Sequence, residues 1–163
     1  MKTIYLVRHA KSGWDNANTS DFERPLNEQG RRSAPRMAEL INDEGVLPEL
    51  VISSPANRAI TTAEIFCDTL GYPRERMLPL LDIYHGGTAE LLTILQQIPD
   101  GCATAMLFGH NPTITDFANL LAGKSIVSME TCGIARIDLE IDSWEGAGRG
   151  KGKLAWYHYP KEH

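Results

Sequence analysis

Short apolar runs alternate along this chain with longer segments whose apolar residues recur at helical spacing. The runs predict strands at residues 3–8, 50–54, 104–109, 134–141 and 154–159. Apolar side chains that recur every three or four positions predict helices at residues 31–40, 57–70, 91–98 and 113–121. The run at 77–83 alternates too weakly to be assigned to either class.

The order of these elements predicts the fold class. Strands that alternate with helices are typical of a three-layer α/β/α domain with a mostly parallel central sheet. A glycine-rich connection at residues 145–152 joins the last two strands, so they are expected to form an antiparallel C-terminal hairpin on one side of the sheet. We find no internal repeat or linker, and we expect residues 1–163 to form a single domain.

Breaker residues predict where some of these elements begin and end. Gly71 is expected to end the helix at 57–70. Pro35 falls in the first turns of the helix at 31–40, where proline is best tolerated. The polar segment 11–25 is predicted to be a long loop, and long loops in compact domains are often functional.

Charge and composition limit the kinds of molecule that this protein is expected to bind. A net charge of -5 and a pI near 5.5 argue against a nucleic-acid-binding or membrane-binding surface, although a local cluster of cations can still bind an anion. No apolar stretch approaches the ~20 residues that span a bilayer, and no signal peptide is evident. Three widely spaced cysteines, without CxxC spacing, predict reduced thiols and a cytoplasmic protein. No residue set predicts a metal site, and no cofactor is expected.

Three of the predicted strands end in groups that suit phosphate chemistry. The first strand ends in Arg8 and His9, Arg58 lies in the first turn of the helix after the second strand, and His110 follows the third strand. In a parallel sheet these junctions lie on one edge, so the side chains meet there. Arginine matches the geometry of phosphoryl oxygens, and histidine can act as a nucleophile or base near neutral pH. Because such cations repel one another unless an anion lies between them, the pattern predicts an oxyanion site.

Each of these residues also has an ordinary structural interpretation. Arg8 and His9 could form a solvated strand end, Arg58 could lie on a helix surface, and His110 could cap the helix that follows it. Their occurrence at equivalent points of three successive strand–helix junctions favours the common site.

The motifs at these junctions resemble those of a known family. Val-Arg-His-Ala-Lys-Ser at 7–12, Ser-Ser-Pro-x-x-Arg-Ala-x-x-Thr-Ala at 53–63 and Gly-His-Asn-Pro at 109–112 resemble the histidine phosphatase superfamily, whose fold is that of phosphoglycerate mutase. The segment Glu-Arg-Pro-Leu-Asn-Glu-Gln-Gly at 23–30 is similar to that of its small members, and the chain looks closest to the SixA-type phosphohistidine phosphatases. One departure is Ala10, which stands where the superfamily usually has glycine.

The resemblance implies a role for each matching residue. His9 would be the nucleophile that takes the phosphoryl group, Arg8 and Arg58 would clamp the non-bridging oxygens, and His110 would stabilise the transition state. Ser12 and the backbone at Asn111 are secondary candidates for phosphate contact. Arg24 is a candidate for the mouth of the site, or alternatively a surface ion pair. Trp14 and Tyr84 are candidates to frame the entrance, or to cover the edge of the core.

The proton donor is the least defined part of the predicted site. Many superfamily members carry a glutamate in the region that here reads Leu-Asp-Ile-Tyr-His-Gly-Gly at 81–87. Asp82 is the candidate general acid, with His85 as a weaker candidate; alternatively Asp82 faces solvent and no dedicated acid exists. An imidazole leaving group needs less protonation than an alkoxide, which favours phosphohistidine as substrate.

We therefore expect a phosphatase that acts without a cofactor on phosphohistidine in a phosphoprotein. A phosphatase of a small phosphoester metabolite and a non-catalytic phosphate-binding module remain the alternatives. A mutase is disfavoured, because the chain shows no insertion that would close a site around a second substrate.

Overall fold

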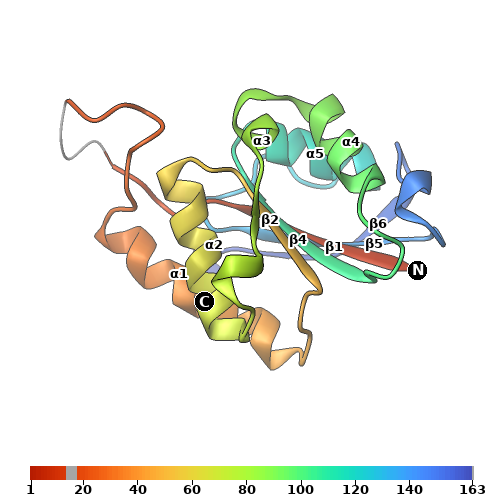
Figure 1. The fold of residues 1–163 in the computed structure, drawn as a ribbon, viewed down its shortest axis with the longest axis horizontal. Helices are drawn as coiled ribbons and strands as arrows, with labels where there is room; N and C mark the ends of the chain where they lie inside the picture. Colours follow the sequence, from red (N-terminus) through yellow and green to blue (C-terminus); the bar gives the residue numbers. More distant parts are fainter. Residues whose placement is uncertain (14–17, 163) are drawn as a thin grey trace.

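The computed structural model of the chain describes residues 1–13 and 18–162. Six strands form one sheet in the order β3-β2-β4-β1-β5-β6 (Figure 1). The elements follow in chain order as β1 (Lys2–Arg8), α1 (Glu28–Asp43), β2 (Leu50–Ser53), α2 (Asn57–Leu70), β3 (Leu78–Pro79), α3 (Leu81–His85), α4 (Thr88–Gln96), β4 (Thr104–Gly109), α5 (Thr113–Ala122), β5 (Ile134–Leu139) and β6 (Gly152–His158). Short 3-10 helices lie at Arg74–Arg76, Trp144–Gly146 and Pro160–Glu162.

The strand pairing confirms the predicted mixed sheet. Strands β1, β4, β2 and β3 pair in parallel, whereas β5 pairs antiparallel with β1 and with β6. The register places Arg8 beside Gly109 and Ser53 beside Phe108. The carboxyl ends of β1, β4 and β2 are therefore neighbours at one edge of the sheet.

Successive side chains of the central strands point to opposite faces of the sheet, so the core has two layers. In β1, Ile4 and Leu6 pack with α4 and α5, whereas Tyr5 and Val7 pack with α1 and α2. Figure 1 shows these helix pairs on opposite faces of the sheet. Because successive side chains of a strand point to opposite faces, the four consecutive apolar residues at 4–7 of β1 need helices on both sides of the sheet.

Some boundaries differ from those predicted. The first helix begins at Glu28 rather than at residue 31, because the side chain of Asn27 caps it by accepting a hydrogen bond from the Gly30 amide at 2.8 Å. Pro35 consequently lies in the interior of α1 and not in its first turns, so that prediction was wrong. Gly71 ends α2 in the left-handed conformation, with φ of 78°, as predicted.

The unassigned run at 77–83 contains the two-residue strand β3 and the beginning of the short helix α3. No helix in residues 1–13 and 18–162 is long and apolar enough to cross a membrane.

Gly30 fixes how closely α1 approaches the segment that follows His9. The amide of Asn27 donates to the Lys11 carbonyl at 2.9 Å, which ties this segment to the start of the helix. A β-carbon on Gly30 would overlap the carbonyl oxygen of Lys11 and would lie 2.9 Å from its amide nitrogen. The absence of a side chain at this position therefore sets the path of the backbone beside His9.

We expect Gly30→Ala to lower the free energy of unfolding by about 1–3 kcal/mol, because the backbone at Lys11 must move to admit the β-carbon. In a helix without such an obstruction, the same change raises the free energy of unfolding by about 0.5–1 kcal/mol. A decrease would therefore indicate the predicted clash with Lys11. Urea unfolding measures the change. Gly101→Ala is the control, because nothing lies within 4 Å of a β-carbon there. A Gly30→Ala protein as stable as wild type would contradict this packing.

Candidate active site

His9 lies directly after β1 and is held in one orientation. Its amide donates to the Gly109 carbonyl at 3.1 Å, and its Nδ1 lies 2.7 Å from the Ala10 carbonyl oxygen. Since a carbonyl can only accept, Nδ1 carries the proton and Nε2 keeps its lone pair. The side chain is almost fully buried, with 7% of the residue exposed. Ala10 does not take a positive φ, so alanine is tolerated at this position.

The surroundings keep the His9 imidazole neutral. Burial lowers its pKa to about 3, against the opposing effect of the hydrogen bond to the Ala10 carbonyl. The charges of His110, Arg58 and Arg8 lower the pKa further. A neutral imidazole with a free Nε2 is the form that can attack phosphorus.

The side chain of Arg8 is held by a backbone carbonyl of the segment that precedes β5. Its Nη1 donates to the Met129 carbonyl at 2.8 Å, while its Nε is buried and has no partner among the described residues. Burial lowers the pKa of Arg8, and the neighbouring Glu130 opposes this shift. The guanidinium remains charged, so an unpaired N–H of a buried cation is available for an anion.

Arg58 lies in the first turn of α2 and is also nearly buried, with 6% exposed. Its Nη1 donates to the Asp21 backbone carbonyl at 2.7 Å, and its Nη2 donates to Asp21 Oδ2 at 3.1 Å. Its Nε is a second buried donor without a partner among the described residues. Buried polar groups in proteins are nearly always hydrogen-bonded, so two unpaired arginine Nε atoms indicate a place for an acceptor.

His110 follows β4 and faces His9. The two rings have centroids 5.3 Å apart, and His110 Nε2 lies 2.7 Å from the hydroxyl oxygen of Ser54. Its Nδ1 is buried without a partner in the part of the chain that is described. Burial lowers the pKa of His110 to about 4, and Arg58 adds to this effect.

A hydrogen-bonded chain links α2 to the backbone beside His9. The Thr62 hydroxyl donates to the Arg58 carbonyl at 2.7 Å and accepts from the Ala10 amide at 3.0 Å. The Cys132 amide donates to the carbonyls of both Arg8 and His9 at 3.0 Å, from a residue with φ of 59°. These contacts fix the position of the imidazole and the arginine backbone from two sides.

These side chains line a cavity of about 340 Å³ at the carboxyl edge of the sheet. Its lining comprises Arg8, His9, Lys11, Ser12, Arg24, Arg58, His110, Asn111 and Thr131. The structure thus brings together the predicted nucleophile, clamp and phosphate-contact residues, whereas Asp82, His85 and Tyr84 are not in the lining. Lys11 and Thr131 were not predicted; Lys11 belongs to the first motif, whereas nothing in the sequence singles out Thr131.

Asp82 lies in the exposed first turn of α3 and is not part of this lining. Its role as proton donor stays a prediction. The side chain of Asn111 donates to Ser128 and to the Met129 carbonyl, at 3.0 and 3.2 Å, so it supports the neighbouring loop. The predicted position of Trp14 lies outside the described residues.

No motif or spacing in the sequence points to Asp21, which connects three of the side chains around the cavity. Its carboxylate accepts hydrogen bonds from Arg24 at 3.0 and 3.1 Å, from Arg58 and from the hydroxyl of Tyr84 at 2.7 Å. The hydrogen bond from Tyr84 is the main reason that the pKa of Asp21 falls to about 2. Arg24 also donates to the Ser12 hydroxyl at 3.0 Å, so the predicted ion pair of Arg24 and its place in the cavity lining occur together.

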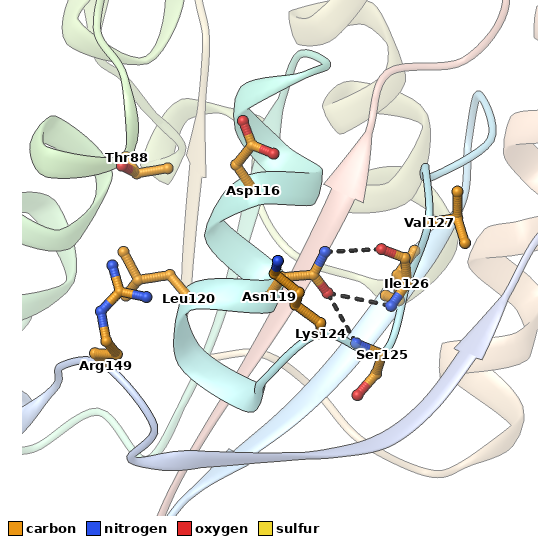
Figure 2. A pocket seen from close by; sticks show the side chains of 9 residues that line it. All are labelled: Thr88, Asp116, Asn119, Leu120, Lys124, Ser125, Ile126, Val127 and Arg149. Carbon is orange, nitrogen blue, oxygen red and sulfur yellow. Dashed lines mark hydrogen bonds between the residues drawn. The ribbon is translucent and has the colours of Figure 1, made fainter.

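A larger hollow, of about 570 Å³, lies along α5 and the segment that follows it (Figure 2). There the Asn119 side chain donates to the Ile126 carbonyl at 2.7 Å and accepts from the amides of Ser125 and Ile126. None of the predicted site residues lines this hollow, and no histidine or cysteine does. Of these two cavities, only that of about 340 Å³ brings together histidines and arginines from separate strand–helix junctions. Within those residues no group of three or more His, Cys, Asp or Glu could hold a metal ion.

Comparison with known proteins places this geometry in a family. Residues 4–138 match the model of the histidine phosphatase superfamily (branch 1). An uncharacterised chloroplastic protein of Arabidopsis thaliana is 31% identical, over 95% of this chain and 74% of that protein. A 2,3-bisphosphoglycerate-dependent phosphoglycerate mutase of Bifidobacterium longum is 38% identical over 51% of this chain, but the match spans only 36% of the mutase.

Solved structures give the same result. The protein histidine phosphatase SixA complexed with tungstate superimposes with a TM-score of 0.84 and 26% identity, over 98% of both chains. A putative SixA from Agrobacterium tumefaciens gives a TM-score of 0.82 and 25% identity, again over 98% of both chains.

The two buried histidines predict a pH dependence of stability. Their pKa values in the folded chain, about 3 and about 4, lie below the ordinary value of 6.5. As the pH falls below 6.5 the unfolded chain therefore binds protons that the folded chain does not, and the free energy of unfolding decreases by up to about 1.4 kcal/mol per pH unit for each histidine.

We expect His9→Asn and His110→Asn each to flatten this decrease between pH 6.5 and pH 4.5. Asp21 does not interfere in this window, because its stabilising ionisation is lost only as the pH falls below the ordinary aspartate value towards about 2. Urea unfolding at a series of pH values measures the slopes. Parallel curves for wild type and both variants would show that the rings are not held neutral.

Proposed function

The chain belongs to the histidine phosphatase superfamily and is a phosphatase, and from this premise we propose that it removes phosphoryl groups from histidine side chains of a phosphoprotein through a covalent intermediate on His9. The observation that carries the proposal is the state of His9 itself. Its imidazole is neutral, its Nδ1 is bound to a carbonyl, and its Nε2 is free beside two arginines with unpaired buried N–H groups.

The proposed reaction has two displacements. In the first, the Nε2 lone pair of His9 attacks phosphorus, an N–P bond forms, and the bond from phosphorus to the leaving nitrogen of the substrate breaks. In the second, water attacks the phosphohistidine, releases inorganic phosphate and restores the free imidazole. Phosphoryl transfer requires mainly in-line positioning and stabilisation of the equatorial oxygens, which are the roles we propose for Arg8, Arg58 and His110.

Two observations support a phosphohistidine substrate. The lining of the cavity contains no Asp or Glu among the described residues, so no carboxylic acid stands ready to protonate an alkoxide leaving group. Imidazole is a better leaving group and needs less assistance. Solved structures that superimpose on this chain include a protein histidine phosphatase and a putative phosphohistidine phosphatase, which also supports this substrate.

We also propose a cytoplasmic location and no resident cofactor for this protein. All three cysteines are free, which fits a reducing compartment. Ser12, Arg24 and the backbone of Asn111 are proposed contacts for the substrate phosphate, because all three residues line the cavity.

The substrate and the nucleophile can be tested together. We expect wild type to release phosphate from a phosphohistidine-bearing protein domain faster than from a panel of small phosphoesters, without added metal. His9→Ala should reduce this turnover by about a thousandfold or more, because the nucleophile is lost. His158→Ala is the control, since this histidine lies on β6 and outside the cavity lining.

The outcome separates the alternatives. Undiminished turnover by His9→Ala would refute the covalent mechanism. A preference for a phosphoester would keep the enzyme class and replace the substrate, whereas phosphate binding without turnover of any substrate would favour a binding module.

The same substrates test the predicted proton donor. Because Asp82 is exposed and lies outside the cavity lining, we expect Asp82→Asn to hydrolyse phosphohistidine at the wild-type rate. A selective slowing of alkyl phosphoesters, by the ~100-fold typical of a lost general acid, would assign the donor role to Asp82. If Asp82→Asn hydrolysed both substrate classes at the wild-type rates, Asp82 would not be the proton donor.

A further inference from the structure

One carboxylate lies among the cations of this site. Both oxygens of Asp21 are engaged: Oδ1 accepts two hydrogen bonds from Arg24, and Oδ2 accepts one each from Arg58 and Tyr84. The backbone carbonyl of Asp21 accepts a further hydrogen bond from Arg58. This single residue therefore contacts two arginines that line the cavity, although Asp21 itself is not part of the lining.

The position of Asp21 lowers the affinity that this site can have for anions. A carboxylate near the cavity repels a phosphoryl group, and it uses N–H groups of arginines that could otherwise bind the ligand. This effect is moderated because the Asp21 side chain is 45% exposed, so solvent screens its charge. A repulsive group at this place is understandable if it orients the cations more than it opposes the anion.

The hydrogen-bond geometry around Asp21 supports a role in orienting the two arginines. Arginine forms paired, directional hydrogen bonds with carboxylates, and these bonds fix the plane of the guanidinium. Arg24 is held in this manner by Oδ1, while its Nη1 reaches the Ser12 hydroxyl. Arg58 donates one N–H of each Nη to the carbonyl and the carboxylate of Asp21, so its plane is fixed while the second N–H of each Nη remains for a ligand.

Tyr84 secures Asp21 on the opposite side. Its hydroxyl donates to Oδ2 at 2.7 Å, and its ring meets the rings of Phe22 and His110 edge-on at centroid distances of 5.1 and 5.6 Å. The carboxylate is thereby connected to the helix α3 as well as to α2. The contacts join three segments that are distant in sequence.

We propose that Asp21 is a positioning residue for the phosphatase reaction, one that holds the guanidinium groups of Arg24 and Arg58 in the orientation that receives a phosphoryl group. This inference rests on the proposed function of the same cavity. It predicts that loss of the Asp21 charge weakens the binding of oxyanions, although the simple removal of a negative charge would strengthen it.

The test is a calorimetric titration of wild type and Asp21→Asn with inorganic phosphate and with tungstate. We expect the dissociation constants of Asp21→Asn to rise by about ten- to a hundredfold, as for other supporting contacts of a site. On a phosphohistidine domain, KM should rise, because Arg24 and Arg58 would contact the phosphoryl group of the bound substrate, and kcat should fall, because these contacts would strengthen in the transition state.

Asp68→Asn is the matched control. Asp68 accepts hydrogen bonds from Nε and Nη2 of Arg74 at 2.9 and 2.6 Å, so it forms the same kind of pair on α2 outside the cavity lining. We expect it to leave oxyanion binding unchanged. If Asp21→Asn does not fold, Tyr84→Phe removes one hydrogen bond and keeps the carboxylate; it should raise the dissociation constants severalfold in the same direction.

A double-mutant cycle tests whether Asp21 acts through the arginines. The effect of Asp21→Asn on phosphate affinity should shrink in an Arg24→Ala or an Arg58→Ala background, because the group that Asp21 orients is then missing. Full additivity in both backgrounds would overturn the proposal. So would unchanged or tighter oxyanion binding by Asp21→Asn or, if that variant does not fold, by Tyr84→Phe.

The two proposals fail in different ways. Wild type that binds phosphate but does not hydrolyse phosphohistidine would refute the proposed substrate, while the comparison of affinities would still decide on Asp21. Wild type that hydrolyses phosphohistidine, together with Asp21→Asn that binds phosphate as tightly as wild type, would refute the role of Asp21 alone.

Discussion

Positive charge gathered at one edge of a sheet is the constraint on which this site depends. Parallel pairing of β1, β4 and β2 brings Arg8, Arg58 and two histidines together, and it leaves Arg58 and His9 buried and the other two half-buried. Burial disfavours the charged form of a histidine, and like charges nearby raise the energy of that form further, so the two histidines give up their protons and keep neutral rings. The arginines cannot do this because their pKa is too high. The neutral nucleophile is thus a consequence of burial first and of its cationic neighbours second.

The remaining charge is compensated in part by backbone carbonyls and by Asp21. The compensation is incomplete, since the Nε atoms of Arg8 and Arg58 stay buried without partners in the described chain. An unpaired buried donor destabilises the fold by about 1–3 kcal/mol. An oxyanion in the cavity that Arg8 and Arg58 line would offset the positive charge that remains there.

The parts of the site that follow from local sequence were predictable, and those that follow from long-range contacts were not. Arg58 and His110 could be placed because each follows an apolar strand, and parallel strands end at a common edge. Asp21 lies in a polar loop without periodicity, and its partners are up to 63 residues away in sequence. Asp82 was selected by its position relative to a family motif, but α3 turns that residue towards solvent. Pro35 was misplaced because the cap that starts α1 depends on one side-chain hydrogen bond.

The chemistry of the leaving group connects these features to the choice of substrate. When a phosphohistidine whose other ring nitrogen carries a proton transfers its phosphoryl group, the ring leaves as a neutral imidazole. His9 attacks from a ring that also carries a proton on its other nitrogen, where Ala10 accepts the hydrogen bond. The first step then exchanges one nitrogen–phosphorus bond for an equivalent one, and no acid is needed to drive it. For an alkyl phosphoester the same step would create an alkoxide in a cavity whose described lining has no carboxylic acid. The arrangement of fixed cations around an unassisted imidazole is therefore better matched to a phosphoryl group on histidine.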